Sequence, residues 1–189
     1  MKIEVLSQYL FDKNVKEMGL NNTNVENCNM AFISIIGTKE CLEYYLDEGM
    51  TKHYFQDHYN VLNLDFDDIS DDVLYNGHHF KGFSMEQAEK TVNFIEGMIN
   101  NGIDEMKIHC RAGMSRSRAI AEFIYRYCKE HNIDVEYVDR NDYTTMLNQD
   151  VLRKLNHAYW KTHNMNGYED GGDYPLDFIE PPIRVINRN

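Results

Sequence analysis

The stretch 107-KIHCRAGMSRSRA-119 decides which architecture this chain is expected to have. Its first residues are typical of a buried strand, and its last residues begin an alanine-led helical run. The loop between them holds Gly113 and puts the thiol of Cys110 six residues before Arg116, where the helix would begin. The stretch therefore predicts a strand, a seven-residue loop and a helix, with a cysteine at the mouth of that helix.

Apolar periodicity elsewhere in the chain indicates more elements of the same two kinds. Strands are expected at Ile3–Leu6, Met30–Ile36, Tyr59–Phe66 and Met106–His109. Helices are expected over 84–102, from the loop through Cys128, and over 148–160, with shorter ones near 7–18 and 38–46. The first of these opens with Ser84 and Gln87 at the spacing of a capping box. Because strands alternate with helices, the sequence predicts an α/β domain with a central sheet.

Composition limits the classes of function that fit. The chain has 189 residues, enough for one domain, expected over 1–163, and residues 164–189 with all three prolines are expected to form an extended tail. A net charge of -12 argues against nucleic-acid or anionic-membrane partners, since both attract a positive surface. With neither a long apolar run nor a secretory signal, we expect a cytoplasmic protein.

The cysteines are expected to be free thiols. They lack a C-x-x-C motif and any spacing typical of metal ligands, and a reducing compartment disfavours disulfides. Cys28, Cys41 and Cys128 are interpreted as small core residues. The histidine pair His78–His79 has no further spaced ligands, so no metal site is expected there.

The loop around Cys110 has the properties of an anion-binding site. Backbone N–H groups at a helix N-terminus lack partners within the helix and carry partial positive charge. Gly113 supplies the backbone freedom for a tight curl, and the guanidinium of Arg116 can offer two donors to phosphate oxygens. The same positive field is expected to lower the pKa of Cys110, while Ser117 can donate a hydrogen bond to its sulfur.

The motif formed by His109, Cys110, Gly113, Arg116 and Ser117 resembles a known signature. "HCRAGMSRS" is similar to the H-C-x-x-G-x-x-R-[ST] sequence of the cysteine-based protein tyrosine phosphatase superfamily. Its S-R-S ending is similar to the dual-specificity branch. The resemblance extends over about residues 30–155, although only the signature itself is sharply specific.

This resemblance implies a central sheet of four to five mostly parallel strands flanked by helices, and no metal or organic cofactor. It implies that Cys110 is the nucleophile of a phosphocysteine mechanism, that Ser117 helps the thiolate to leave, and that His109 supports the cysteine through a hydrogen bond to backbone. The residues expected to bind phosphate are Arg111, Ala112, Gly113, Met114, Ser115 and Arg116.

The superfamily also uses an aspartate upstream of the cysteine as general acid. In "NLDFDDIS" the candidate that fits best is Asp68, with Asp67 as the alternative and Asp71 or Asp72 left open. Asp65 shares the alternation of the strand and is expected to be a strand residue. The stretch "DDVLYNGHHFKGF" lies between acid and cysteine, and we expect a substrate-facing loop or a lid there.

The sequence thus predicts a phosphomonoester hydrolase whose substrate is a phosphorylated protein or a small phosphoester. Its leading interpretation is a protein tyrosine or dual-specificity phosphatase. The alternatives are a phosphatase of a non-protein substrate, such as a phosphoinositide or an RNA 5′-triphosphate, and a phosphate-binding module without turnover.

Overall fold

A parallel five-stranded sheet forms the centre of the protein. The computed structural model describes residues 1–44, 52–139 and 147–163, so the expected tail at 164–189 lies outside the described residues. The strand order is β3-β2-β6-β1-β7, and every neighbouring pair is parallel. The bounds are β1 Lys2–Ser7, β2 Met30–Ile36, β3 Val61–Asp65, β6 Glu105–Cys110 and β7 Glu136–Asp139.

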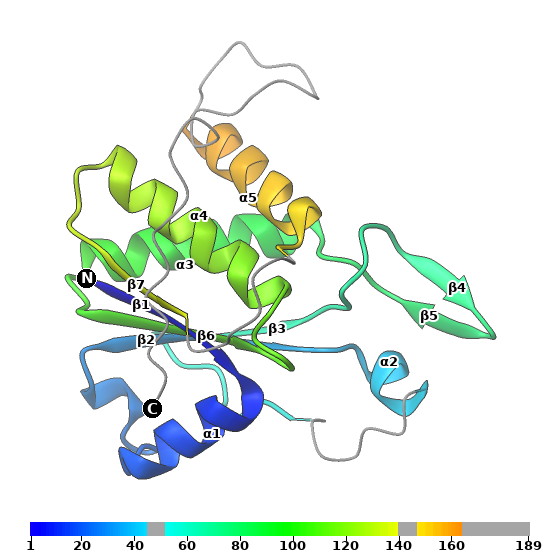
Figure 1. The fold of residues 1–189 in the computed structure, drawn as a ribbon, viewed down its shortest axis with the longest axis horizontal. Coiled ribbons are helices and arrows are strands. Elements are labelled where there is room, and N and C mark those ends of the chain that lie inside the picture. The colour runs from blue at the N-terminus through cyan, green and yellow to red at the C-terminus, as the bar shows by residue number, and fades with distance from the viewer. Residues whose placement is uncertain (45–51, 140–146, 164–189) are drawn as a thin grey trace.

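Helices cover both faces of this sheet (Figure 1). The helices α3 (Met85–Asn100), α4 (Arg116–Glu130) and α5 (Gln149–Thr162) lie together on one face, and α1 (Gln8–Glu17) lies on the other. The predicted capping box is present at the start of α3, where Ser84 and Gln87 bond each other's backbone N–H groups. None of the described helices is long and apolar enough to cross a membrane.

The side chains of each strand alternate between two hydrophobic cores. In β3, Leu62 and Leu64 enter the larger core beneath α3, α4 and α5, whereas Val61 enters the smaller one with Phe11 and Val15 of α1. The side chains of this strand therefore divide between its two faces. Because both faces of the sheet are covered, β2 is almost continuously apolar, as expected for a parallel sheet, whereas β1 and β6 also bury the ion pair of Glu4 and Lys107.

Four elements were not predicted from the sequence. The edge strand β7 has four residues, and a 3₁₀ turn spans Val25–Asn27. The stretch expected to be a loop or lid contains a β-hairpin, β4 (Val73–Tyr75) and β5 (His78–Phe80), which projects beside α2 (Lys39–Tyr44) (Figure 1). Its turn is Asn76–Gly77, with φ of 51° and 80°, and such Asn-Gly turns match the twist of a two-stranded ribbon.

Candidate active site

A pocket of about 380 Å³ opens at the carboxyl edge of the central sheet. In a parallel α/β sheet this edge collects the loops that follow the strands, and ligands bind there. The walls come from the segments after four strands: Gln8 after β1, Gly37 after β2, Asp68 after β3 and the loop that follows Cys110 of β6. The topology thus gathers residues that are far apart in the sequence.

Cys110 lies at the base of this pocket, with only 3% of its surface exposed. Burial would by itself raise the pKa of the thiol, but the charge of Arg116, the hydroxyl of Ser117 and the backbone N–H groups of Ser117 and Met114 together lower it. The Sγ of Cys110 is 3.1 Å from the Oγ of Ser117, so the predicted contact between these residues is present. Cys110 is therefore disposed to be a thiolate.

The loop from Cys110 to the start of α4 has the predicted curl. Gly113 is buried and has a φ of 69°, in the left-handed region that favours glycine. Ser115 precedes the first residue of α4 but makes no side-chain hydrogen bond to cap the helix. The side chain leaves the helix N-terminus uncapped, so this end of α4 retains the donors and the partial charge that favour an anion.

Arg116 is held beside the cysteine by the two neighbouring strand ends. Its Nη1 donates to the carbonyl oxygens of Ile36, at 3.2 Å, and Phe66, at 2.5 Å, and its guanidinium lies 5.7 Å from the centre of the Phe66 ring. The Nε of Arg116 is buried without a hydrogen-bond partner. Burying an N–H donor without an acceptor costs free energy, and an oxyanion in the pocket would accept a hydrogen bond from it.

Asp68 is exposed at the rim of the same pocket. Its Oδ1 accepts hydrogen bonds from the Oγ of Ser115 and from the Nδ2 of Asn148, both at 2.8 Å. Asn148 also caps α5 by accepting from the N–H of Val151. The aspartate is thereby held against the loop that carries the cysteine.

Asp67 also lines the pocket, but it is buried and both of its carboxylate oxygens are hydrogen-bonded. Its carboxylate accepts from the backbone N–H and hydroxyl of Thr38, at 2.9 and 2.7 Å, and from the backbone N–H of Lys81, at 2.9 Å. These bonds join the segments after β2 and β3 to the end of the hairpin. Asp67 thus acts as a structural anchor, and the geometry favours Asp68 over this alternative acid.

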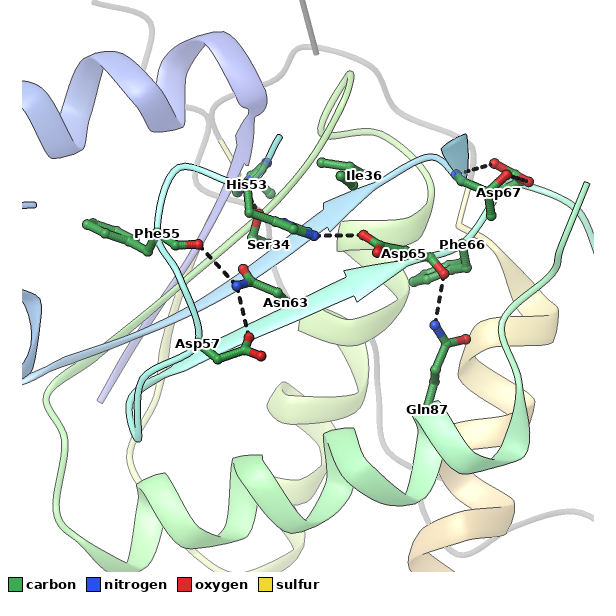
Figure 2. Close-up of polar contacts among 12 residues, drawn as sticks. Ser34, Ile36, His53, Phe55, Asp57, Asn63, Asp65, Phe66, Asp67 and Gln87 are labelled. Carbon is green, nitrogen blue, oxygen red and sulfur yellow. Dashed lines mark hydrogen bonds and ion pairs between the residues drawn. The ribbon is translucent and has the colours of Figure 1, made fainter. Parts of the chain in front are cut away.

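The other acid candidates lie away from the pocket lining. Asp65 is the last residue of β3, as predicted, and its carboxylate bonds His53 (Figure 2). Asp72 accepts from the backbone N–H of Gly82 at 2.9 Å. Asp71 is exposed. None of these three is among the residues that line the pocket.

Two residues of the pocket region were not identified from the sequence. Ser34, on β2, bonds His109 through a contact of 2.7 Å between Oγ and Nε2, whereas only a backbone partner was expected for His109. Cys41, interpreted as a core residue, lines the pocket instead, and burial together with Asp67 raises its pKa to about 12. Neither position has a local sequence signal, because the surroundings of Ser34 and Cys41 depend on which strands become neighbours.

The remaining predicted residues take varied positions. Arg111, Ala112, Met114 and Ser115 line the pocket. The four cysteines are free thiols in the structure. Within the described ranges, no group of three or more histidine, cysteine, aspartate or glutamate residues is arranged to hold a metal ion.

Comparison with known proteins adds no relative. No family model matches the sequence, and the searches of curated proteins and of solved structures also give no match. The function is therefore inferred from the geometry of the pocket.

Proposed function

We propose that this protein is a cysteine-dependent phosphomonoester hydrolase with a fold like that of the protein tyrosine phosphatases. The observation that carries the proposal is the buried thiol of Cys110, whose pKa is lowered by the guanidinium of Arg116 at the base of an open pocket. A thiolate beside unsatisfied donors is suited to attack an anionic centre that those donors bind. We also propose that the protein works in a reducing compartment, such as the cytoplasm, because the thiol of Cys110 has to stay free.

In the first step the sulfur of Cys110 attacks phosphorus, so that a P–S bond forms as the bond to the ester oxygen breaks. Arg116 and the amides of the loop hold the other phosphoryl oxygens. Asp68, entering with a proton, gives that proton to the departing oxygen, which leaves as an alcohol. The products of this step are the alcohol and a phosphocysteine.

In the second step water attacks the phosphocysteine. Asp68, now a carboxylate, takes a proton from the water while the water oxygen forms a bond to phosphorus and the P–S bond breaks. The hydroxyl of Ser117, 3.1 Å from Sγ, stabilises the thiolate that leaves. Inorganic phosphate departs and the site returns to its starting state.

Phosphorylated protein is our preferred substrate, and the net charge of -12 counts against long RNA and anionic membranes. A phosphoinositide or an RNA 5′-triphosphate remains the alternative within the enzymes, and a phosphate-binding module is the alternative outside them. The test is release of phosphate from a small aryl phosphate by the purified protein between pH 5 and 8. Absence of turnover over this range would contradict an enzyme.

We expect Asp68→Asn to lower turnover by about 10²- to 10³-fold, because it removes the proton that the leaving oxygen needs. The loss should be largest for phenyl phosphate and smaller for a nitrophenyl ester, whose oxygen leaves with less help. Steady-state rates for the two substrates measure this contrast. Equal losses for both would argue that Asp68 is not the acid.

Asp67→Asn is the matched control, one residue away. We expect it to lower the free energy of unfolding by about 1–3 kcal/mol, because it weakens the buried bonds to Thr38 and Lys81. Urea unfolding measures the stability of both variants. Asp68→Asn should unfold close to the wild type, since Asp68 is exposed.

A further inference from the structure

A chain of short polar contacts runs from the surface to the residue before the nucleophile. Asp65 Oδ1 is 2.7 Å from His53 Nε2, His53 Nδ1 is 2.6 Å from Ser34 Oγ, and Ser34 Oγ is 2.7 Å from His109 Nε2. The side chain of Asp65 is 64% exposed and that of His53 is 15% exposed, while Ser34 and His109 are buried. This chain of contacts thus links solvent to His109, the strand residue next to Cys110.

The surrounding structure holds this chain in place. Figure 2 shows His53 reaching from the segment before β3 to Asp65 at the end of that strand. Asn63 donates to the carbonyl of Phe55 and to Asp57, and so ties the same segment to β3. Gln87 of α3 donates to the backbone carbonyl of Asp65 at 2.9 Å.

The His109 ring is fixed and neutral. Phe11 of α1 packs against it with 4.1 Å between ring centres. Burial, followed by the charges of His53 and Arg116, lowers the pKa of His109 to about 3, against the opposing effect of the Cys110 backbone. A neutral imidazole carries one proton, on either Nδ1 or Nε2, and its partners decide which.

The direction of the hydrogen bonds follows from the donor inventory. A carboxylate only accepts, so His53 Nε2 carries a proton and donates to Asp65. With His53 neutral, Nδ1 has no proton, so Ser34 donates to it and accepts from Nε2–H of His109. With His53 protonated, Nδ1 donates to Ser34, whose hydroxyl then donates to Nε2 of His109. The proton of His109 must then be on Nδ1, and the net change is one proton taken from solvent.

We propose that Ser34, His53 and Asp65 are positioning residues that set the tautomer of His109 and thereby tune the reactivity of Cys110. In the acidic form two contributions favour a thiolate: the Nδ1–H of His109, whose nitrogen is buried without a hydrogen-bond partner in the structure, lies on the side away from Ser34, and His53 carries a positive charge. In the neutral form both contributions are lost. The inference concerns the thiol itself and rests on the proposed function only for its effect on turnover.

Other charged groups lie near this chain of contacts. Arg116 of α4 acts on both His109 and Cys110. Lys107, two residues before His109 on the same strand, forms ion pairs with Glu4 and Glu105. His53 and Asp65 form the part of the hydrogen-bonded chain that solvent reaches, so a proton from solvent enters it there.

The test measures the rate at which iodoacetamide alkylates Cys110 between pH 5 and 9. Mass spectrometry of the peptide that contains Cys110 gives this rate. At pH 6 and below we expect His53→Gln to react about threefold to tenfold more slowly than the wild type, which corresponds to a rise of about 0.5–1 unit in the pKa of Cys110. Above about pH 8 the two rates should converge, because an ordinary imidazole carries no charge there. A purely structural role would not give this dependence on pH.

His58→Gln is the matched control. His58 lies in the same segment, its side chain is 16% exposed, and it pairs with Glu26 at 3.0 Å without contacting the chain. We expect its alkylation profile to match the wild type. The inference is overturned if His53→Gln follows the wild-type profile at all pH values, or if His58→Gln changes it equally.

Asp65→Asn provides a second variant at an exposed position, and it should move the acidic step to lower pH by removing the partner of protonated His53. Nitrogen NMR of His109 in the wild type should report Nε2–H at pH 8 and Nδ1–H in the acidic form. One unchanged tautomer would overturn the inference even if a variant failed to fold. If the wild type releases no phosphate but the alkylation rates of the wild type and His53→Gln still differ as expected, only the proposed function is contradicted.

Discussion

Cys110→Ser is expected to lower phosphate release by roughly 10⁴-fold or more while the protein still binds phosphate or vanadate. An alkoxide is far harder to form than a thiolate, so the charge of Arg116 and the donors around Sγ cannot make serine an equivalent nucleophile. The anion-binding donors belong to the loop and to Arg116, and both remain in the variant. Phosphate release and vanadate binding by calorimetry measure the two properties separately.

Cys28→Ser is the control for this substitution. Cys28 is a half-buried free thiol near Val25, outside the pocket lining, and a hydroxyl can keep its contact with the carbonyl of Val25. Its turnover should stay close to that of the wild type. If Cys110→Ser kept its activity, the nucleophile would be elsewhere; if it lost both anion binding and folding, Cys110 would be a structural residue.

Substitution of Arg116 should separate its geometry from its charge. Arg116→Lys keeps a cation but loses the planar fork, and we expect turnover to fall by about 10²- to 10³-fold. Arg116→Gln also removes the charge that does most to lower the pKa of Cys110, so that pKa should rise. The Gln variant should therefore be alkylated more slowly at pH 6, whereas the Lys variant should remain closer to the wild type.

Arg153→Lys is the matched control for Arg116→Lys. Arg153 is an exposed residue of α5 that pairs with Asp150 at 2.7 Å, so its replacement should leave phosphate release unchanged. Normal turnover by Arg116→Lys would contradict the phosphate-holding role of the guanidinium. Thermal unfolding distinguishes loss of function from loss of structure, because Arg116 also bonds the carbonyls of Ile36 and Phe66.

Elements whose signals are local were predicted well. The strand at Met30–Ile36 has the expected bounds, and α3 begins at the expected capping box. The hairpin β4–β5 also had a local signal, Asn76–Gly77 between apolar residues, which was not used. The short edge strand β7 has little pattern of its own, since it is stabilised by pairing with β1.

The network around His109 could not be found in this way. Ser34 and His109 are 75 residues apart and meet only because β2 and β6 become neighbours in the sheet. Ser34, read alone, is a polar residue in an apolar strand. The sheet order gives it two imidazole partners, and it becomes the centre of a polar chain.

The sequence by itself determined the conformation of the loop. Cys110, Gly113 and Arg116 are only a few residues apart, so their spacing limits the positions that they can take relative to one another. The resemblance favoured Asp68 over Asp67, but only the tertiary structure showed how their surroundings differ, because the neighbouring carboxylates meet different partners beyond the end of β3. One turns inward to the N–H groups of Thr38 and Lys81. The other reaches Ser115 and Asn148, which are 47 and 80 residues away. Their different surroundings depend on which segments meet at the carboxyl edge of the sheet, and that is a property of the whole fold.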